Sequence, residues 1–392
     1  MAIEHHSIRL PNHLGVPLLC LPYAGGAAGA YRDLRRAGAG GFEVVPVQLP
    51  GREERGDEPP EFSVADVADQ IAPRTGRPYA IYGHSMGARL GFEVVRELRR
   101  RGLPPPVRFY VGGAHPPDRP VPLAAAASLP DERFVDQLVR RAGAQPELRD
   151  VPELRELFLP ALRADFTWIK NYRYTPEPPL AVPVVAFAGL DDAEVGPPDM
   201  LGWARHTSAG FKLRTIDGGH FFLKEQPGSL ARLLTEDLSG TESLEDGEIH
   251  VNLSPGPTAT ARGGGSRDGG VGHGVGVAVR PMRSLPADRD LLDPGELEQI
   301  ESAAEEERDW LTARAGAAKQ ALASASGADP RHVTFPDLAA RAPWRPGGEL
   351  APWQVHLLSV PTPSGEVIMA LATSHDRVRL RVDLVPPAGW SR

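Results

Sequence analysis

A serine flanked by two glycines stands in the pentapeptide Gly83-His84-Ser85-Met86-Gly87. An apolar, strand-like run at 79–83 precedes it, and an amphipathic, helix-like stretch at 86–102 follows it. A serine on a sharp strand-to-helix turn has a strained backbone, and its hydroxyl projects from the edge of the sheet. The start of the helix and the Met86 N–H then face the oxyanion that develops when the serine attacks a carbonyl group. We therefore take Ser85 as the candidate nucleophile.

A serine hydroxyl becomes an efficient nucleophile only when a base accepts its proton and a carboxylate orients that base. His220 is the candidate base, because the double glycine before it lets the backbone turn sharply and direct the imidazole back over the sheet. Two aspartates, Asp191 and Asp192, follow a strand-like run at 182–189. The carboxyl ends of parallel strands are where such sheets bind ligands. The chain order serine, acid, histidine is the order of the α/β-hydrolases.

Three aspartates are candidates for the acid of this triad. Asp192 is preferred, because it is the third residue after Gly189 in a G-x-x-D turn. Asp191 then caps the turn. Asp217, which directly precedes the double glycine, is the remaining alternative, and in that case Asp192 is an ordinary loop residue.

A glycine-rich loop at 22–27 follows the first strand-like run of the chain. Its glycines allow a backbone N–H to approach a carbonyl oxygen closely, and we take the N–H of Ala24 as the second oxyanion donor beside that of Met86. Phosphate binding by this loop is a weaker alternative, because no G-x-x-x-x-G-K-[ST] pattern follows.

The elements that must position these residues follow from hydrophobic periodicity. Short apolar runs alternate with longer amphipathic stretches, which predicts a mostly parallel sheet with helices on both faces. The apolar runs lie at 16–22, 42–50, 79–83, 107–113 and 182–189.

The interval between the last two runs is longer than one crossover helix requires. It contains two amphipathic stretches, at 131–143 and 152–170. We expect a helical lid at about 116–180 that excludes water from the serine and shapes an acyl channel. A fixed packing layer without motion is the equal alternative.

Composition excludes several other classes of protein. A formal net charge of −8 disfavours nucleic-acid binding, which needs a concentrated positive field. The single cysteine, Cys20, excludes an intramolecular disulfide framework and a multi-cysteine zinc site. The chain has neither a signal-peptide pattern nor a run of about 18 apolar residues, so we expect a cytoplasmic protein without a membrane partner.

The length of 392 residues favours two domains. Glycine and proline are densest at 254–276, which predicts a mobile loop or linker. We expect a first α/β domain over 1–240, a linker over 241–276 that extends partly into the second domain, and a smaller α+β domain over 277–392, with 245 as its alternative start. In this domain Asp293 is a candidate helix N-cap, and strand-like runs at 353–360 and 366–373 predict a pair of strands.

Residues 16–240 resemble a stand-alone type II thioesterase of polyketide and nonribosomal peptide synthesis, an α/β-hydrolase family. The matching runs are LPYAGGAAGAY, VQLPGREER, YGHSMGARLGFEV, LPALRADF, GLDDAEV and GGHFFL. The resemblance implies Ser85 as nucleophile, His220 as base and Asp192 as orienting acid, with the N–H groups of Ala24 and Met86 as oxyanion hole.

Members of this family hydrolyse aberrant or stalled acyl groups from the phosphopantetheine arm of carrier proteins. The resemblance therefore implies an acyl-loaded carrier protein as partner, and the triad chemistry needs neither a metal nor another cofactor. Two departures concern the acyl-chain preference: Tyr23 stands where the family has histidine, and Lys170 replaces an acidic residue. An esterase or acyltransferase with the same triad, or a non-catalytic protein that recruits carriers, are the alternative functions.

The back half is similar, more weakly, to phosphopantetheinyl transferases. The family's magnesium site uses three carboxylates, and the resemblance places Ala278, Arg280 and Gln320 at those positions. Magnesium requires hard, anionic oxygen ligands, so we expect a degenerate domain without transferase activity. The hypothesis that follows is a carrier-docking module, in which basic residues face an acidic carrier protein. Those residues are Arg280, Arg283, Arg314 and Lys319.

Overall fold

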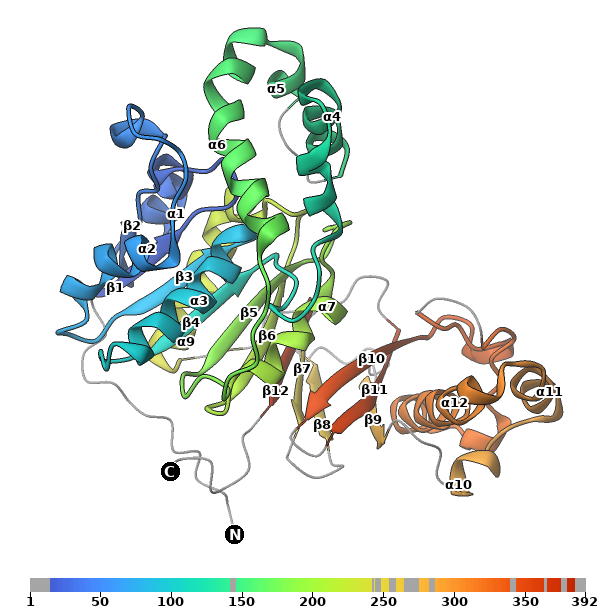
Figure 1. Cartoon of the computed structure of the whole chain (residues 1–392). Coiled ribbons are helices and arrows are strands. Elements are labelled where there is room, and N and C mark those ends of the chain that lie inside the picture. The colour runs from blue at the N-terminus through green and yellow to red at the C-terminus, as the bar shows by residue number, and fades with distance from the viewer. Residues whose placement is uncertain are drawn as a thin grey trace. The chain divides into compact units, whose positions relative to one another are not determined.

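The structure is a computed structural model of the chain (Figure 1). It describes residues 15–141, 146–241, 243, 248–253, 259–263, 275–281, 286–338, 343–362, 365–374 and 379–384. Contacts divide the chain into two compact units. The first comprises Met1–Ala209 and Arg214–Ser243, and the second comprises Gly210–Leu213 and Leu244–Arg392.

The first unit is built on a sheet whose strands follow the order β2-β1-β3-β4-β5, and β6 follows β5, with residues 214–216 of that strand in this unit. The first five of these strands pair in parallel, as the alternation of apolar and amphipathic segments predicts. The strands are β1 (Val16–Leu21), β2 (Phe42–Pro46), β3 (Ala80–His84), β4 (Arg108–Gly112), β5 (Val184–Gly189) and β6 (Phe211–Ile216).

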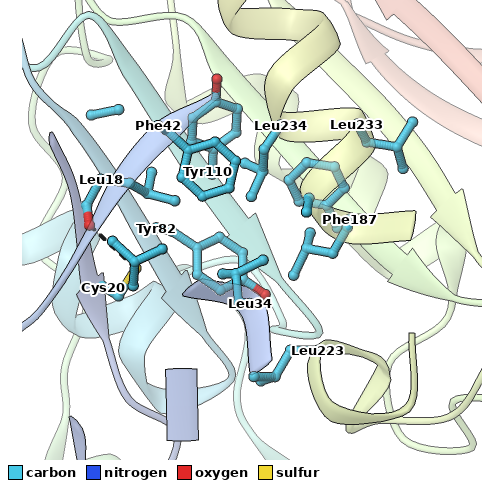
Figure 2. Close-up of a cluster of buried hydrophobic side chains, with 14 of the residues drawn as sticks. Leu18, Cys20, Leu34, Phe42, Tyr82, Tyr110, Phe187, Leu223, Leu233 and Leu234 are labelled. Atoms are coloured by element: carbon cyan, nitrogen blue, oxygen red, sulfur yellow. Dashed lines mark hydrogen bonds between the residues drawn. The ribbon is translucent and has the colours of Figure 1, made fainter. Parts of the chain in front are cut away.

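Helices cover both faces of this sheet. On one face, side chains of α1 and α9 pack on Leu18, Tyr82 and Phe187, and Figure 2 shows this cluster of buried residues. On the other face lies α3, whose Gly91 faces the side chains of Phe109 and Leu21. These helices and their neighbours are α1 (Arg32–Ala37), α2 (Val64–Ile71), α3 (Met86–Arg100), α7 (Pro197–Leu201), α8 (Phe222–Glu225) and α9 (Pro227–Ser239), with short 3-10 turns η1 (Ala28–Tyr31), η2 (Glu53–Arg55), η3 (Ala72–Arg74) and η5 (Gly202–His206).

The crossing of β3 and α3 requires glycine at two positions. A Cβ atom at Gly83 would lie 2.2 Å from the carbonyl oxygen of Gly87. A Cβ atom at Gly87 would lie 2.2 Å from the carbonyl oxygen of Leu21, in β1. Both contacts are with backbone atoms, which cannot move aside as a flexible side chain does. The helix therefore approaches the sheet closely only because these two residues lack side chains.

A helical insertion separates β4 from β5 and is drawn in green at the top of Figure 1. It contains η4 (Pro122–Ser128), α4 (Asp131–Arg141), α5 (Glu147–Asp150) and α6 (Pro152–Asn171). α4 and α6 correspond to the two amphipathic stretches of the predicted lid. They pack on each other through Phe134 and Phe166, whose rings meet edge to face at a centroid distance of 5.2 Å.

The second unit contains an antiparallel sheet in the order β10-β11-β9, on which helix α12 packs. It also contains β12, which pairs in parallel with β7, and β8, which pairs antiparallel with β7. The predicted strand pair is present as β10 and β11, and Asp293 caps α11 in a capping box with Glu296. The elements are β7 (Glu248–Leu253), β8 (Ala259–Gly263), β9 (Val275–Pro281), α10 (Pro286–Arg289), α11 (Pro294–Ser302), α12 (Glu305–Ser326), η6 (Pro330–His332), η7 (Gly348–Leu350), β10 (Gln354–Thr362), β11 (Gly365–Thr373) and β12 (Arg379–Leu384).

The range predicted as a linker, 241–276, was expected to extend partly into the second domain. Its described residues include β7 and β8, which belong to the second unit. β7 is a strand because Ile249, Val251 and Leu253 alternate with other residues and bury their side chains on one face. Residues 254–258 and 264–274, with the dense glycines of the predicted loop, lie outside the described residues.

The prediction that Lys319 faces a carrier protein is wrong. Its side chain is fully buried, and its ammonium lies 2.6 Å from Glu296 Oε2 and donates to the carbonyl oxygen of Val333. Glu296 is also fully buried and accepts a hydrogen bond from the N–H of Phe335. The alanine-rich face of α12 that carries Lys319 forms the core of this unit, so the ammonium pairs inside the protein. Arg283 lies outside the described residues.

No helix among the described residues is long and apolar enough to cross a membrane.

Replacing Gly87 with alanine is expected to lower the free energy of unfolding by about 1–3 kcal/mol, because the added methyl group collides with the backbone of β1. Urea unfolding followed by circular dichroism measures this change. Gly76→Ala is the matched control, because a Cβ atom at Gly76 meets nothing within 4 Å. Equal destabilisation by the two variants would contradict the close-packing account.

Candidate active site

Ser85 occupies the turn between β3 and α3 in a strained conformation, with φ of 54° and ψ of −117°. Among the described residues, it shares a positive φ with one other non-glycine residue, Glu53. The Ser85 N–H donates to the carbonyl oxygen of Gly112 at the end of β4, at 2.7 Å, which fixes the turn against the neighbouring strand. The sequence predicts this strand-to-helix turn, and the backbone has the strain that such a turn requires.

The structure brings Ser85, His220 and Asp192 together from three separate turns. Ser85 Oγ lies 3.1 Å from His220 Nε2, and His220 Nδ1 lies 2.8 Å from Asp192 Oδ2. Asp192 can only accept from Nδ1–H, so Nε2 is left to accept the hydroxyl proton of Ser85. This is the geometry in which imidazole serves as a general base for serine.

Of the three candidate aspartates, Asp192 is the one that contacts His220. Its side chain is fully buried, and its other oxygen, Oδ1, accepts from the N–H groups of Glu194 and Val195 at 2.9 and 3.0 Å. Burial raises the pKa of Asp192, but the bonds from His220 and the two N–H groups outweigh this effect, so its pKa lies below the usual value. Asp191 is exposed. The carboxylate of Asp192 therefore stays ionised and holds the imidazole in one orientation.

His84 supports the loop that carries His220. Its ring is fully buried, with Nδ1 3.0 Å from the Tyr82 hydroxyl and Nε2 2.7 Å from the carbonyl oxygen of His220. Burial and the neighbouring His220 lower the pKa of His84 to about 3, so this ring remains neutral at ordinary pH. A neutral ring donates from one nitrogen and accepts at the other, which fits a hydroxyl on one side and a carbonyl on the other.

Ala24 and Met86 line the same cavity as Ser85 and His220. Met86 is the first residue of α3, where helix N–H groups have no partner within the helix. In the loop at 22–27, the N–H of Gly25 donates to Asp165 and that of Gly26 to the carbonyl oxygen of Tyr23. The assignment of the Ala24 and Met86 N–H groups as an oxyanion hole stays a prediction.

The cavity has a volume of about 80 Å³ and is mainly apolar. Its walls come from the glycine-rich loop at 22–27, the start of α3, the helical insertion and the loops after β4, β5 and β6. Besides the residues already named, the lining side chains are Tyr23, Arg89, Ala114, His115, Val121, Leu123, Leu138, Leu162, Phe166, Ile169, Glu194, Val195 and Phe221. Such an apolar chamber suits an acyl chain. Lys170 lies outside this lining and contacts Ser128, at 2.6 Å.

Three polar side chains in this wall were not anticipated as site residues: Arg89, His115 and Glu194. Arg89 lies four residues after Ser85 on α3, so helical spacing could have indicated that both project to the same side. Its guanidinium donates to the carbonyl oxygens of Pro116 and Arg119, which ties the start of the insertion to α3. Burial lowers the pKa of His115.

The positions predicted for a degenerate metal site lie on two elements that pack together. Ala278 is buried on β9, and Gln320 is half-buried on α12. A Cβ atom at Gly276 of β9 would lie 1.9 Å from the carbonyl oxygen of Ala321, which shows how closely the two elements approach. Arg280 lies on β9, but its side chain is outside the described part of the chain. Within the described residues, no group of three or more His, Cys, Asp or Glu side chains could hold a metal ion.

Ser85 is expected to react with an alkyl fluorophosphonate, because His220 accepts its proton as the Oγ–P bond forms and fluoride leaves. Asp192→Asn is expected to slow this labelling by about 10⁴-fold, since the amide no longer orients the imidazole correctly. Asp191→Asn is the matched control and should label at the normal rate. Intact mass spectrometry follows the adduct over time, and equal rates in the two variants would exclude Asp192 as the orienting acid.

Comparisons with known proteins agree with this geometry. A family model described as a thioesterase domain matches residues 16–238. The gramicidin S biosynthesis protein GrsT of Aneurinibacillus migulanus is 37% identical over 227 residues, which cover 56% of this chain and 88% of that protein.

Two solved structures resemble the first unit. The type II thioesterase BorB from the borrelidin biosynthetic cluster is 34% identical, with a TM-score of 0.51 over 58% of this chain and 94% of that chain. ClbQ from the colibactin NRPS/PKS pathway is 27% identical, with a TM-score of 0.54 over 58% of this chain and 98% of that chain. The chain belongs to the thioesterase family, and its first unit has the α/β-hydrolase fold of that family.

Proposed function

We propose that this protein is a type II thioesterase of polyketide or nonribosomal peptide biosynthesis, which hydrolyses acyl groups from the phosphopantetheine arm of carrier proteins. The observation that carries the proposal is the hydrogen-bonded series Ser85–His220–Asp192, at 3.1 and 2.8 Å, beside an apolar cavity. The similarity to the type II thioesterase BorB supports the class of enzyme. The similarity to ClbQ, from an NRPS/PKS pathway, supports the class of pathway.

The reaction follows from the geometry in two steps. Ser85 Oγ attacks the thioester carbonyl carbon while its proton passes to His220 Nε2. The N–H groups of Ala24 and Met86 stabilise the oxyanion, the C–S bond breaks, and the phosphopantetheine sulfur leaves with its electron pair and the proton. A water molecule then attacks the acyl-serine ester, His220 accepts one of its protons, and the carboxylic acid leaves as the proton returns to Ser85.

A thioester suits this site for a chemical reason. A thiol has a pKa of about 8.5, so its thiolate leaves far more readily than an amine or alkoxide does. The site therefore needs only modest proton donation to the leaving group, which a single imidazole supplies. The apolar walls hold the acyl part, and the triad at the end of the cavity faces the carbonyl.

Acyl transfer to an amine or alcohol is the main alternative on the same triad. Incubating the protein with acyl-loaded carrier protein and following intact mass separates the possibilities. We expect free carboxylic acid and deacylated carrier protein from the wild type, and no turnover from Ser85→Ala, because the variant lacks the nucleophile. A new ester or amide product would identify a transferase, stable binding without turnover a recruiting protein, and unchanged turnover by Ser85→Ala would remove that residue from its role.

We propose a carrier contact in the second unit as a separate hypothesis, now centred on Arg314 and Trp310 of α12. The guanidinium of half-buried Arg314 lies over the Trp310 ring at 4.2 Å and over the buried Trp344 ring at 4.8 Å, and Trp310 is 36% exposed. A cation stacked on an exposed ring is a suitable contact for an acidic protein surface. The degenerate relationship to phosphopantetheinyl transferases remains part of this hypothesis.

Arg314→Gln is expected to raise KM for acyl-carrier protein several-fold and to leave KM for a small acyl-cysteamine thioester unchanged, because the carrier reaches Arg314 in this hypothesis and the small substrate does not. Steady-state kinetics with both substrates measures the difference. Arg331→Gln, at an exposed arginine of the same unit, is the control. Equal changes for both substrates, or no change for either, would contradict the docking hypothesis.

A further inference from the structure

The two glycines that follow Ala24 are held by a pair of buried charged residues. The N–H of Gly25 donates to Asp165 Oδ2 at 2.7 Å. The carbonyl oxygen of Gly26 accepts from Arg52 Nη1 at 3.1 Å. Both ends of the segment directly after Ala24 are therefore fixed by side chains from outside the loop.

Arg52 and Asp165 also bind each other. Arg52 Nη1 lies 2.8 Å from Asp165 Oδ2, and Arg52 Nη2 lies 2.9 Å from Asp165 Oδ1, so the contact is bidentate. The exposed fractions of the two side chains are 6% and 0%. Arg52 Nε additionally donates to the carbonyl oxygen of Pro50. Both charged groups are buried, so water cannot replace either partner and the pair keeps one geometry. The pair therefore defines the position of the loop more sharply than apolar packing does.

Asp165 lies on α6, the helix that also supplies Leu162, Phe166 and Ile169 to the cavity wall. The helix and the loop are in direct contact. A Cβ atom at Gly25, whose φ is +75°, would lie 2.5 Å from Leu162 Cδ2. The acyl-binding wall and the backbone that follows the Ala24 N–H are thus connected through one helix.

We propose that Asp165 and Arg52 are positioning residues that hold the Ala24 N–H in the oxyanion hole, so that the hole is complete only while α6 lies against the loop. This inference rests on the proposed function, in which the Ala24 N–H stabilises the tetrahedral intermediate. Neither side chain lines the cavity, so both act through the loop. Their contribution is therefore made in the transition state rather than in ground-state binding.

Asp165→Asn is the direct test, because asparagine keeps the shape but removes the charge that binds both Arg52 and Gly25. We expect kcat for a small acyl thioester to fall by about 10²–10³-fold, the effect of losing one oxyanion donor, with KM changed less than about threefold. The affinity for an alkylboronic acid, which forms a tetrahedral adduct with Ser85, should fall in parallel. The affinity for the thioether analogue of the substrate, which forms no adduct, should stay unchanged.

Asp237→Asn is the matched control. Asp237 is a buried aspartate of the same unit, 4% exposed in its side chain, and it pairs with Arg108 away from the loop. It should lower stability without changing kcat or boronate affinity. Arg52→Lys, which keeps a positive charge but loses the bidentate contact, serves as a second variant and as the replacement if Asp165→Asn does not fold.

Boronate binding is measured by calorimetry and does not depend on turnover. If the wild type binds the boronate but does not hydrolyse thioesters, the proposed function is contradicted. The inference about Asp165 and Arg52 is then tested by the boronate affinities alone. Unchanged boronate affinity in both Asp165→Asn and Arg52→Lys, or equal losses of boronate and thioether affinity, would overturn the inference. So would absence of boronate binding in the wild type.

Discussion

The close approach of α3 to the sheet is the constraint on which the site depends. Gly83 and Gly87 leave room for the helix to start directly above β1, and Ser85 between them is forced to a positive φ. Two features maintain that strain. The Ser85 N–H is hydrogen-bonded to Gly112 of β4, and α3 buries one face along its length. In the proposed mechanism, a serine that is fixed in this way needs no rearrangement before it attacks, which is the benefit of storing strain in the turn.

The remaining groups reach the serine from loops that the sheet brings to one edge. The Asp192 loop is closed by hydrogen bonds to its own N–H groups, and the His220 loop is held from below by His84. Each catalytic group thus has a support that does not itself take part in proton transfer. Arg52 and Asp165 support the glycine-rich loop at 22–27 in the same way, through their contacts with Gly25 and Gly26. The site is a set of short turns, each fixed by one or two buried polar contacts.

Much of the fold, and the meeting of Ser85, His220 and Asp192, was predictable, because each rests on a local pattern. Apolar runs marked the strands of the parallel sheet, and glycines marked the turns at Ser85 and His220. The choice among aspartates depended on a G-x-x-D turn, and in the structure Asp192 is the one that meets His220. Other features depend on contacts between distant segments. Nothing near Lys319 indicates that Glu296 lies beside it, and nothing near Asp165 indicates Arg52, 113 positions away.

The helical insertion forms part of the wall of the cavity beside Ser85, and this has a consequence for the range of substrates. Phe166 lines it and rests edge-on against Phe134, so the packing of α4 on α6 fixes the position of part of the cavity wall. The range of acyl groups that fit then depends on the side chains that the insertion contributes to this wall. Substitutions in the insertion would therefore shift the range of accepted chains, while the turns that carry Ser85, Asp192 and His220 stay unchanged.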